Sequence, residues 1–233
     1  MTTESTQTRA GGLFAIGDLH GDLERAHAAL ALVGLTNSSH QWTGGSATLV
    51  QTGDLVDRGP QSLEVLGLFE SLEAQARDAG GHLQRLLGNH EVLNMEGDVR
   101  YVHPAELRKV GGSRSWSALF EPRQGTVASK LTKYPTAVVA GVGACRTLFV
   151  HGGLQPQYLR GDGGWKAQLA ALNEQFKGGL LLARSKAGVG GADARRKLDL
   201  IGSEGPVWYR GFALGSEGAV SDGVCERSGH GYK

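Results

Sequence analysis

The chain is poor in cysteine and aromatic residues, has no excess charge of either sign and contains no long apolar run. Of its 233 residues, 24 are basic and 23 acidic, so the formal net charge of +1 creates no overall field that would attract nucleic acid or an anionic membrane. We therefore expect neither partner. The hydrophobic content of 40% is enough for a full core, as one large domain rather than two small ones.

The two cysteines, Cys145 and Cys225, lie far apart and do not form the framework of a small disulfide-rich protein. This usage predicts a reducing compartment, and we expect a cytoplasmic location. No window approaches the roughly 18 consecutive apolar residues of a membrane span. Residues 1–12 lack the apolar centre of a secretory signal, although their Ser and Thr content leaves an organelle such as the chloroplast open as an alternative.

Apolar, strand-like segments alternate with amphipathic helical segments over the first 91 residues. Strands are predicted within 11–18, 46–54 and 82–91, and each runs into polar residues. A helix is predicted over 22–35, where Leu23, Ala26, Leu30 and Val33 share one face, and a second helix from Gln61 until "DAGG" ends it. This alternation is typical of an α/β fold.

The segment 101–133 breaks the alternation; it is predicted to be mostly helical, as an insertion over the strand ends. Residues 134–153 contain two β-rich apolar runs joined at "GVGACR", which predict a hairpin. The fold class is therefore α/β, with mixed β-sheet layers flanked by α-helices rather than one purely parallel sheet.

From Leu154 onward the pattern is weaker. One helix is predicted over 164–186, a glycine-rich exposed loop over 187–197, and a short ordered element at "GPVWYRGFA". The last residues have almost no apolar content and cannot add a core strand. The expected organisation is a disordered start over 1–11, one domain over 12–213 and an irregular tail over 214–233.

Four predicted strands end in glycine next to acidic, amide or imidazole side chains. The crevice beyond the carboxyl ends of strands is where α/β sheets bind ligands, so these side chains are expected to meet. Carboxylate, imidazole and amide oxygen together suit divalent Mn, Fe or Zn, and crowded carboxylates repel one another unless cations neutralise them. The residues are Asp18, His20 and Asp22; Asp54, Asp57 and Arg58; Asn89, His90 and Glu91; and His151.

Each residue also has a purely structural interpretation. Asp22 fits a helix N-cap, Asp54 a turn, and Asp57 with Arg58 a surface ion pair. Asn89 and His151 are compatible with turns, and His90 with a buried, hydrogen-bonded histidine. Recurrence at four strand ends favours the metal site. Glu91 is interpreted as supporting the site and the following helix, not as catalytic.

The motifs "GDLHGD" (17–22), "GDLVDRG" (53–59), "GNHE" (88–91) and "HGG" (151–153), in this order, resemble the calcineurin-like metallophosphoesterases, specifically the phosphoprotein phosphatase family. The segment "GPVWYRG" (205–211) further resembles the Shewanella-like protein phosphatases. The resemblance covers roughly residues 12–213. It implies a metallophosphoesterase β-sandwich flanked by helices.

The resemblance also implies the metal ligands. Asp18 and His20 would hold one ion, Asp54 would bridge two, and Asn89 and His151 would hold the second. The implied cofactors are two divalent metal ions, and such a pair yields a hydroxide near neutral pH and stabilises an in-line displacement.

The implied catalytic residues are His90, Asp57, Arg58 and Arg210. His90 would act as general acid toward the leaving group, and Asp57 would orient its imidazole. Arg58 would bind the substrate phosphate through its forked donors, with Arg210 of "GPVWYRG" as a second contact.

Two features depart from the common pattern of the family. Leu87 precedes "GNHE" where common eukaryotic members have an arginine, a feature of the Shewanella-like branch. A late strand ending in Gly-His-Thr, which supplies a further metal-binding histidine in the family, is missing; His230 has no apolar run before it. We therefore expect a C-terminally shortened chain with activity weakened by loss of that ligand.

The first functional hypothesis is a phosphomonoesterase that hydrolyses phosphorylated protein or peptide by attack of a metal-bridging hydroxide. A second is a diadenosine polyphosphate hydrolase, because those enzymes share the "GDxHG", "GDxVxRG" and "GNHE" pattern. A third is a binding protein that keeps the crevice without turnover. Nothing in the sequence indicates an oligomeric state.

Overall fold

The computed structural model describes residues 11–159, 162–184 and 192–214. Its first sheet has three parallel strands, β1 (Leu13–Ile16), β2 (Thr48–Gln51) and β3 (His82–Arg85), in the order β1-β2-β3. Leu13 pairs with Thr48 and Thr48 with His82, so the three strands start level and their carboxyl ends lie at one edge. The predicted alternation of strands and helices is confirmed.

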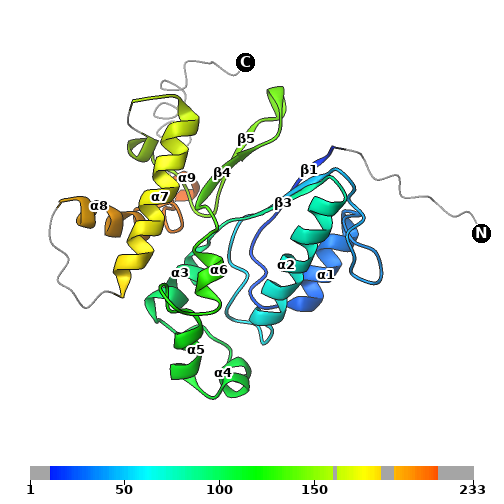
Figure 1. Cartoon of the computed structure of the whole chain (residues 1–233), viewed down its shortest axis with the longest axis horizontal. Helices are drawn as coiled ribbons and strands as arrows, with labels where there is room; N and C mark the ends of the chain where they lie inside the picture. The colour runs from blue at the N-terminus through cyan, green and yellow to red at the C-terminus, as the bar shows by residue number, and fades with distance from the viewer. Residues whose placement is uncertain (1–10, 160–161, 185–191, 215–233) are drawn as a thin grey trace, which may run out of the picture.

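Two helices connect the parallel strands, as such crossovers require. They are α1 (Leu23–Leu32) and α2 (Ser62–Asp78), which lie side by side (Figure 1). Asp22 caps α1 by accepting a hydrogen bond from the Arg25 amide at 2.9 Å, so its predicted capping role is confirmed. Helix α2 buries one face on the sheet, through Val65, Leu66, Phe69, Leu72 and Ala76.

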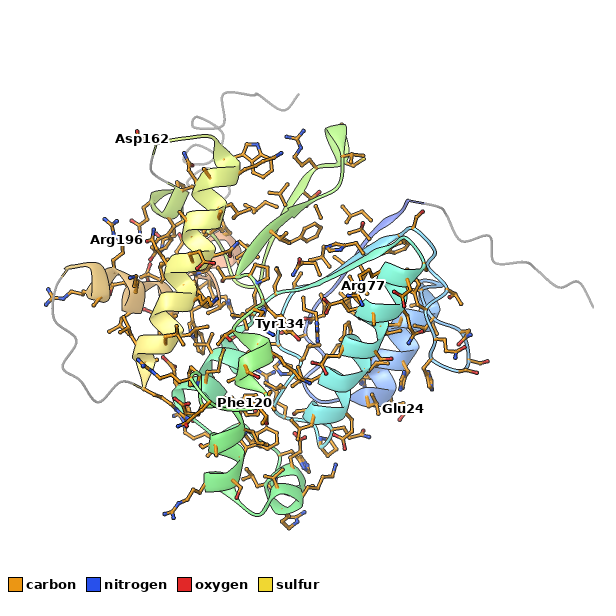
Figure 2. The ribbon with its side chains drawn as sticks, viewed as in Figure 1. Glu24, Arg77, Phe120, Tyr134, Asp162 and Arg196 are labelled. Atoms are coloured by element: carbon orange, nitrogen blue, oxygen red, sulfur yellow. The ribbon has the colours of Figure 1, made fainter. Side chains whose placement is uncertain are left out.

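The region after β3 is helical, and the predicted helical segment 101–133 is confirmed within it. It contains α3 (Asn89–Glu96), α4 (Pro104–Val110), α5 (Ser113–Leu119) and α6 (Ala128–Leu131). Trp116 and Phe120 are completely buried there and stack with ring centroids 5.1 Å apart. Figure 2 shows Phe120 among these helices and Tyr134 between α6 and the strands. The helices form a compact group below the sheet in Figure 1.

The predicted hairpin is confirmed as β4 (Ala137–Ala140) and β5 (Thr147–Val150), which pair antiparallel around the short 3-10 helix η1 (Gly143–Cys145). The two strands form a sheet of their own, so parallel and antiparallel strands are both present but in separate sheets. Leu148 of β5 is 42% exposed, whereas Val50 of β2 is 0% exposed.

The remaining elements are η2 (Pro156–Leu159), α7 (Trp165–Ala183), α8 (Ala192–Ile201) and α9 (Gly211–Leu214). The predicted exposed loop was wrong over 192–197, where α8 packs on α7. Leu200 and Ile201 are buried in the core. Gly179 permits the contact, because a Cβ there would lie 2.3 Å from the Lys197 carbonyl oxygen.

Arg195 and Arg196 are exposed on α8, and Arg196 points outward in Figure 2. The predicted disordered start and irregular tail fall, apart from Gly11 and Leu214, outside the described residues, as do Cys225 and His230. Within the described ranges, no helix is both long enough and apolar enough to cross a membrane.

Candidate active site

The loops after β1 and β2 are bonded to each other through their backbones. The amides of Leu19 and His20 both donate to the Asp54 carbonyl, at 2.9 and 3.0 Å, and the Gly21 amide donates to the Leu55 carbonyl at 2.8 Å. These bonds bring the first and second polar motifs together at the carboxyl edge of the sheet, where ligand crevices form.

Two glycines allow the second and third motifs to meet. Gly53 has φ +100°, and a Cβ there would lie 2.5 Å from the Gly88 amide nitrogen. A Cβ at Gly88 would in turn lie 2.2 Å from Oδ1 of Asp54. Any side chain at either position would separate the loop after β2 from the start of α3.

Backbone strain is concentrated at the site. His20, Asp54, Asp57 and Arg58 have positive φ, between 46° and 70°. Non-glycine residues in this left-handed region cost roughly 1–3 kcal/mol each, and such strain persists where surrounding contacts over-determine the conformation. This conformational cost therefore falls on residues that the sequence predicts to be in the site.

Asp54 lies at the centre of the candidate metal ligands. Its Oδ2 is 3.6 Å from Nε2 of His20 and 3.5 Å from Nε2 of His151. Asp18 lies beside both histidines, with Oδ2 at 3.7 Å from Nε2 of His20 and Oδ1 at 3.9 Å from Nδ1 of His151. Asn89 completes the set, with Oδ1 at 2.8 Å from Nε2 of His151.

His20 turns one ring nitrogen toward the carboxylates. Its Nδ1 lies 3.0 Å from the Val56 carbonyl, which can only accept, so Nδ1 carries a proton and Nε2 is the nitrogen that faces Asp18 and Asp54. Burial opposes the charged form of the ring, but these carboxylates outweigh it and raise the pKa of His20. Nε2 is buried and has no hydrogen-bond partner. An unpaired nitrogen between two carboxylates fits a bound cation, with the second nitrogen oriented by a carbonyl.

His151 repeats this arrangement. Its Nδ1 lies 2.9 Å from the Thr52 carbonyl, and burial lowers the pKa of His151, which favours the neutral ring. Two acceptors, Nε2 of His151 and Oδ1 of Asn89, then face one another at 2.8 Å. Atoms that bind one ion at about 2.0–2.2 Å lie at such spacings, so this pair also fits a cation.

The charges around Asp54 also favour a bound cation. Asp54 is 2% exposed, and burial raises the pKa of its carboxyl, an effect reinforced by the charge of Asp18. A divalent ion would compensate the buried negative charge. The residues present therefore fit divalent cations, with Asp54 placed between both histidines, and the individual ligand assignments stay predictions.

Glu91 holds the Asp54 loop in place. Its Oε2 accepts from the amides of Asp54 and Gly88 at 2.8 Å, and its Oε1 accepts from Leu55 at 2.8 Å and Val56 at 3.3 Å. Glu91 is 1% exposed, and burial, followed by the charge of Asp54, raises its pKa. It supports both the start of α3 and the site, as the sequence indicated.

His90 and Asp57 form a buried pair beside these ligands. Nδ1 of His90 lies 2.8 Å from Oδ2 of Asp57, and the two side chains are 3% and 0% exposed. Nε2 of His90 lies 3.2 Å from Nη2 of Arg58, which can only donate, so this contact requires a lone pair on Nε2. His90 also groups with His20 and Asp54 as three nearby potential ligands, but its two nitrogens already have these partners.

Arg210 reaches the site from the C-terminal region. The amides of Gly152 and Gly153 donate to the Pro206 carbonyl at 2.8 and 3.1 Å, which docks the segment 205–211 against the end of β5. A Cβ at Gly152 would lie 2.8 Å from Nη1 of Arg210. Arg58 and Arg210 are both exposed, and they come from segments far apart in the sequence.

All nine predicted site residues therefore gather at one place, and further residues join them. Asn94 and Tyr101 were missed: the Asn94 amide contacts Asp57, and the Tyr101 ring lies edge-on to His90 with centroids 5.1 Å apart. Asn94 follows His90 by four positions in α3, so helical spacing could have placed both on one face. No sequence signal pointed to Tyr101.

Comparison with known proteins identifies the pattern. The model of the calcineurin-like phosphoesterase family matches residues 13–219. An uncharacterized protein of Schizosaccharomyces pombe is 35% identical over 207 residues, which cover 88% of this chain and 59% of that protein. Shewanella-like protein phosphatase 2 of Arabidopsis thaliana is 34% identical over 208 residues, covering 71% of this chain and 51% of that protein.

A solved structure is also similar. The cold-active protein-tyrosine phosphatase of a psychrophilic Shewanella species superimposes with a TM-score of 0.68 at 26% identity, covering 91% of this chain and 62% of that chain. The chain thus spans between about half and two thirds of the length of these relatives.

Proposed function

Because the chain belongs to the calcineurin-like phosphoesterase family, we propose that it is a metal-dependent phosphomonoesterase acting on phosphorylated protein or peptide. The observation that carries this proposal is the buried, unpartnered Nε2 of His20 beside Asp54, whose carboxylate also approaches Nε2 of His151. The names of the phosphatase relatives support the substrate class.

Asp18, His20 and Asp54 would hold one divalent ion of Mn, Fe or Zn, and Asp54, Asn89 and His151 the second. When bound, such a pair supplies positive charge to the phosphate oxygens and makes water nucleophilic near neutral pH. Asp54 is suited to both ions because its Oδ2 faces both histidines.

The phosphate would be bound by Arg58 and Arg210. Both guanidiniums are exposed at the rim of the site, and their forked donors match phosphate oxygens in pairs. In the structure Nη2 of Arg58 donates to Nε2 of His90; if this donor turns to the phosphate, Nε2 is free to take up a proton from water.

His90 would then donate the Nε2 proton to the oxygen of the leaving group. Asp57 accepts from Nδ1 and so fixes the ring orientation and stabilises the protonated imidazole. The P–O bond breaks as water oxygen adds to phosphorus, so the products are inorganic phosphate and the dephosphorylated hydroxyl.

The test is phosphate release from a phosphotyrosine and a phosphoserine peptide with added Mn²⁺, in parallel with hydrolysis of a diadenosine polyphosphate. We expect peptide turnover that chelators abolish and that His90→Asn lowers by about 10²–10⁴-fold. Hydrolysis of the dinucleotide alone would show that the substrate is a diadenosine polyphosphate and not a phosphorylated peptide. Metal binding without turnover of any substrate would contradict an enzymatic role.

A further inference from the structure

A buried hydrogen-bond chain leads from α5 to the proposed general acid. Trp116 is 0% exposed, and its indole Nε1 donates to Oδ1 of Asn94 at 2.6 Å. Asn94, which is 1% exposed, donates from Nδ2 to Oδ1 of Asp57 and to the His90 carbonyl, both at 2.9 Å. Oδ2 of Asp57 then accepts from Nδ1 of His90 at 2.8 Å.

Trp116 determines which groups donate and which accept along these hydrogen bonds. An indole N–H can only donate, so it must face the carbonyl oxygen of the Asn94 amide. The NH₂ group of Asn94 is thereby turned toward Asp57. With the opposite amide orientation, two donors would face each other at the indole and two acceptors at the carboxylate, each buried and unpaired.

Asp57 depends on that donor for its own orientation. Its carboxylate has one oxygen for Asn94 and one for His90, while its backbone amide donates to Oγ of Ser62 at 3.0 Å. All four side chains from Trp116 to His90 are at most 3% exposed, so bulk water does not replace a lost partner. In such surroundings a missing bond is costly and the network acts as a unit.

We propose that Trp116 is a positioning residue for the general acid: through Asn94 and Asp57 it holds the His90 imidazole in the orientation that delivers a proton to the leaving group. This inference rests on the proposed function of His90. Its alternative is that Trp116 contributes only packing, through its stack on Phe120.

The test compares Trp116→Phe, which removes the N–H and keeps an aromatic ring, with Phe120→Leu, which disturbs the same stack and leaves the N–H. Phenyl phosphate needs a proton on its leaving oxygen, whereas 2,4-dinitrophenyl phosphate leaves readily without one. We expect Trp116→Phe to lower kcat/KM about tenfold for phenyl phosphate and less than twofold for the dinitrophenyl ester. Phe120→Leu should lower both by the same factor.

Equal losses on both esters in Trp116→Phe, or no loss on either, would overturn the proposal. If Trp116→Phe does not fold, Asn94→Leu, which removes the donor to Asp57 at similar volume, is expected to show the same leaving-group dependence.

A second readout needs no turnover and so separates this inference from the proposed function. The Nδ1 proton of His90, held by Asp57, should give a downfield proton resonance in the full chain. It should persist in Phe120→Leu and broaden or disappear in Trp116→Phe. An inactive parent protein with this pattern would refute the phosphatase proposal and show only that Trp116 orients the His90 ring, while an unchanged resonance in Trp116→Phe would refute that orientation itself.

Discussion

The part of the chain before residue 134 and the part after it meet at the site but are built differently. The first part carries a level parallel sheet whose central strand is buried from Leu49 to Gln51, and it supplies seven of the nine predicted site residues. The second part supplies His151 from an exposed hairpin and Arg210 from the segment after α8. The end of the hairpin is attached by Nδ1 of His151, which donates to the Thr52 carbonyl at 2.9 Å.

This difference separates two requirements of the site. The first part is held together by backbone bonds between loops and by the amides that Glu91 accepts. The second part contributes the proposed ligand His151, which is placed by contacts between segments far apart in the sequence, such as its hydrogen bond to Thr52. Changes to Asp54 or to the bonds that hold its loop should therefore affect every function of the site, whereas changes to His151 or Arg210 should affect one ion or one phosphate contact.

The largest effect is expected from Asp54→Asn. Removing the shared carboxylate should lower Mn²⁺-dependent activity by at least about 100-fold. Even the loss of a residue that only hydrogen-bonds to a metal ligand lowers metal affinity or activity by about 10–100-fold. Because Asp54 is a buried carboxyl near Asp18 and Glu91, the metal-free variant should be as stable as the parent or more stable. Metal content and urea unfolding in chelator measure both; full metal binding by the variant would argue against the shared role.

His151→Ala tests the second part directly. It should reduce bound metal from two ions to one per chain, while the fold of the first part is preserved. His20→Ala, from the first part, is the matched comparison and should remove the other ion. Titration with Mn²⁺ under chelator-controlled conditions gives the stoichiometry; loss of both ions in His151→Ala would mean that the two sites are not separable.

Glu91→Gln should destabilise the first part by about 2 kcal/mol, because an NH₂ group would replace an oxygen that accepts two backbone amides. Urea denaturation followed by circular dichroism measures the change. An unchanged unfolding free energy would show that the Asp54 loop does not depend on Glu91.

The smallest effects are expected from two helix glycines. Gly179→Ala should cost about 1–2 kcal/mol, because its Cβ would lie 2.3 Å from the Lys197 carbonyl and force α8 away from α7. Gly67→Ala, in α2, has no atom within 4 Å of the new Cβ and should stabilise by about 0.5–1 kcal/mol. Thermal unfolding measures both variants; no loss of stability in Gly179→Ala would contradict the packing of α8 on α7.

The two parts also differ in how far the sequence predicted them. In the first, strict strand-helix alternation places polar strand ends at one edge, so the meeting of Asp18, Asp54 and Asn89 followed from topology. In the second part, "ADARRK" was predicted to be an exposed loop because it is mostly polar. The residues of α8 that pack on the core, Leu200 and Ile201, come only after it.

The hydrogen bonds that support the site could not be predicted from the sequence either. Asn94 and Trp116 are separated by 22 positions, and neither belongs to a strand-end motif. Their contact depends on how α5 packs against α3, which helical periodicity within either segment does not specify. Likewise, "GNHE" indicated a helix start at Glu91 but not the four amides that this side chain binds.

The most direct measurement is anomalous diffraction from crystals of the chain grown with Mn²⁺. We expect two peaks about 3.5–4 Å apart, one beside Asp18 and His20 and the other beside Asn89 and His151, with Asp54 next to both. Manganese bound elsewhere, or a cluster of these side chains with no peak at saturating Mn²⁺, would contradict it.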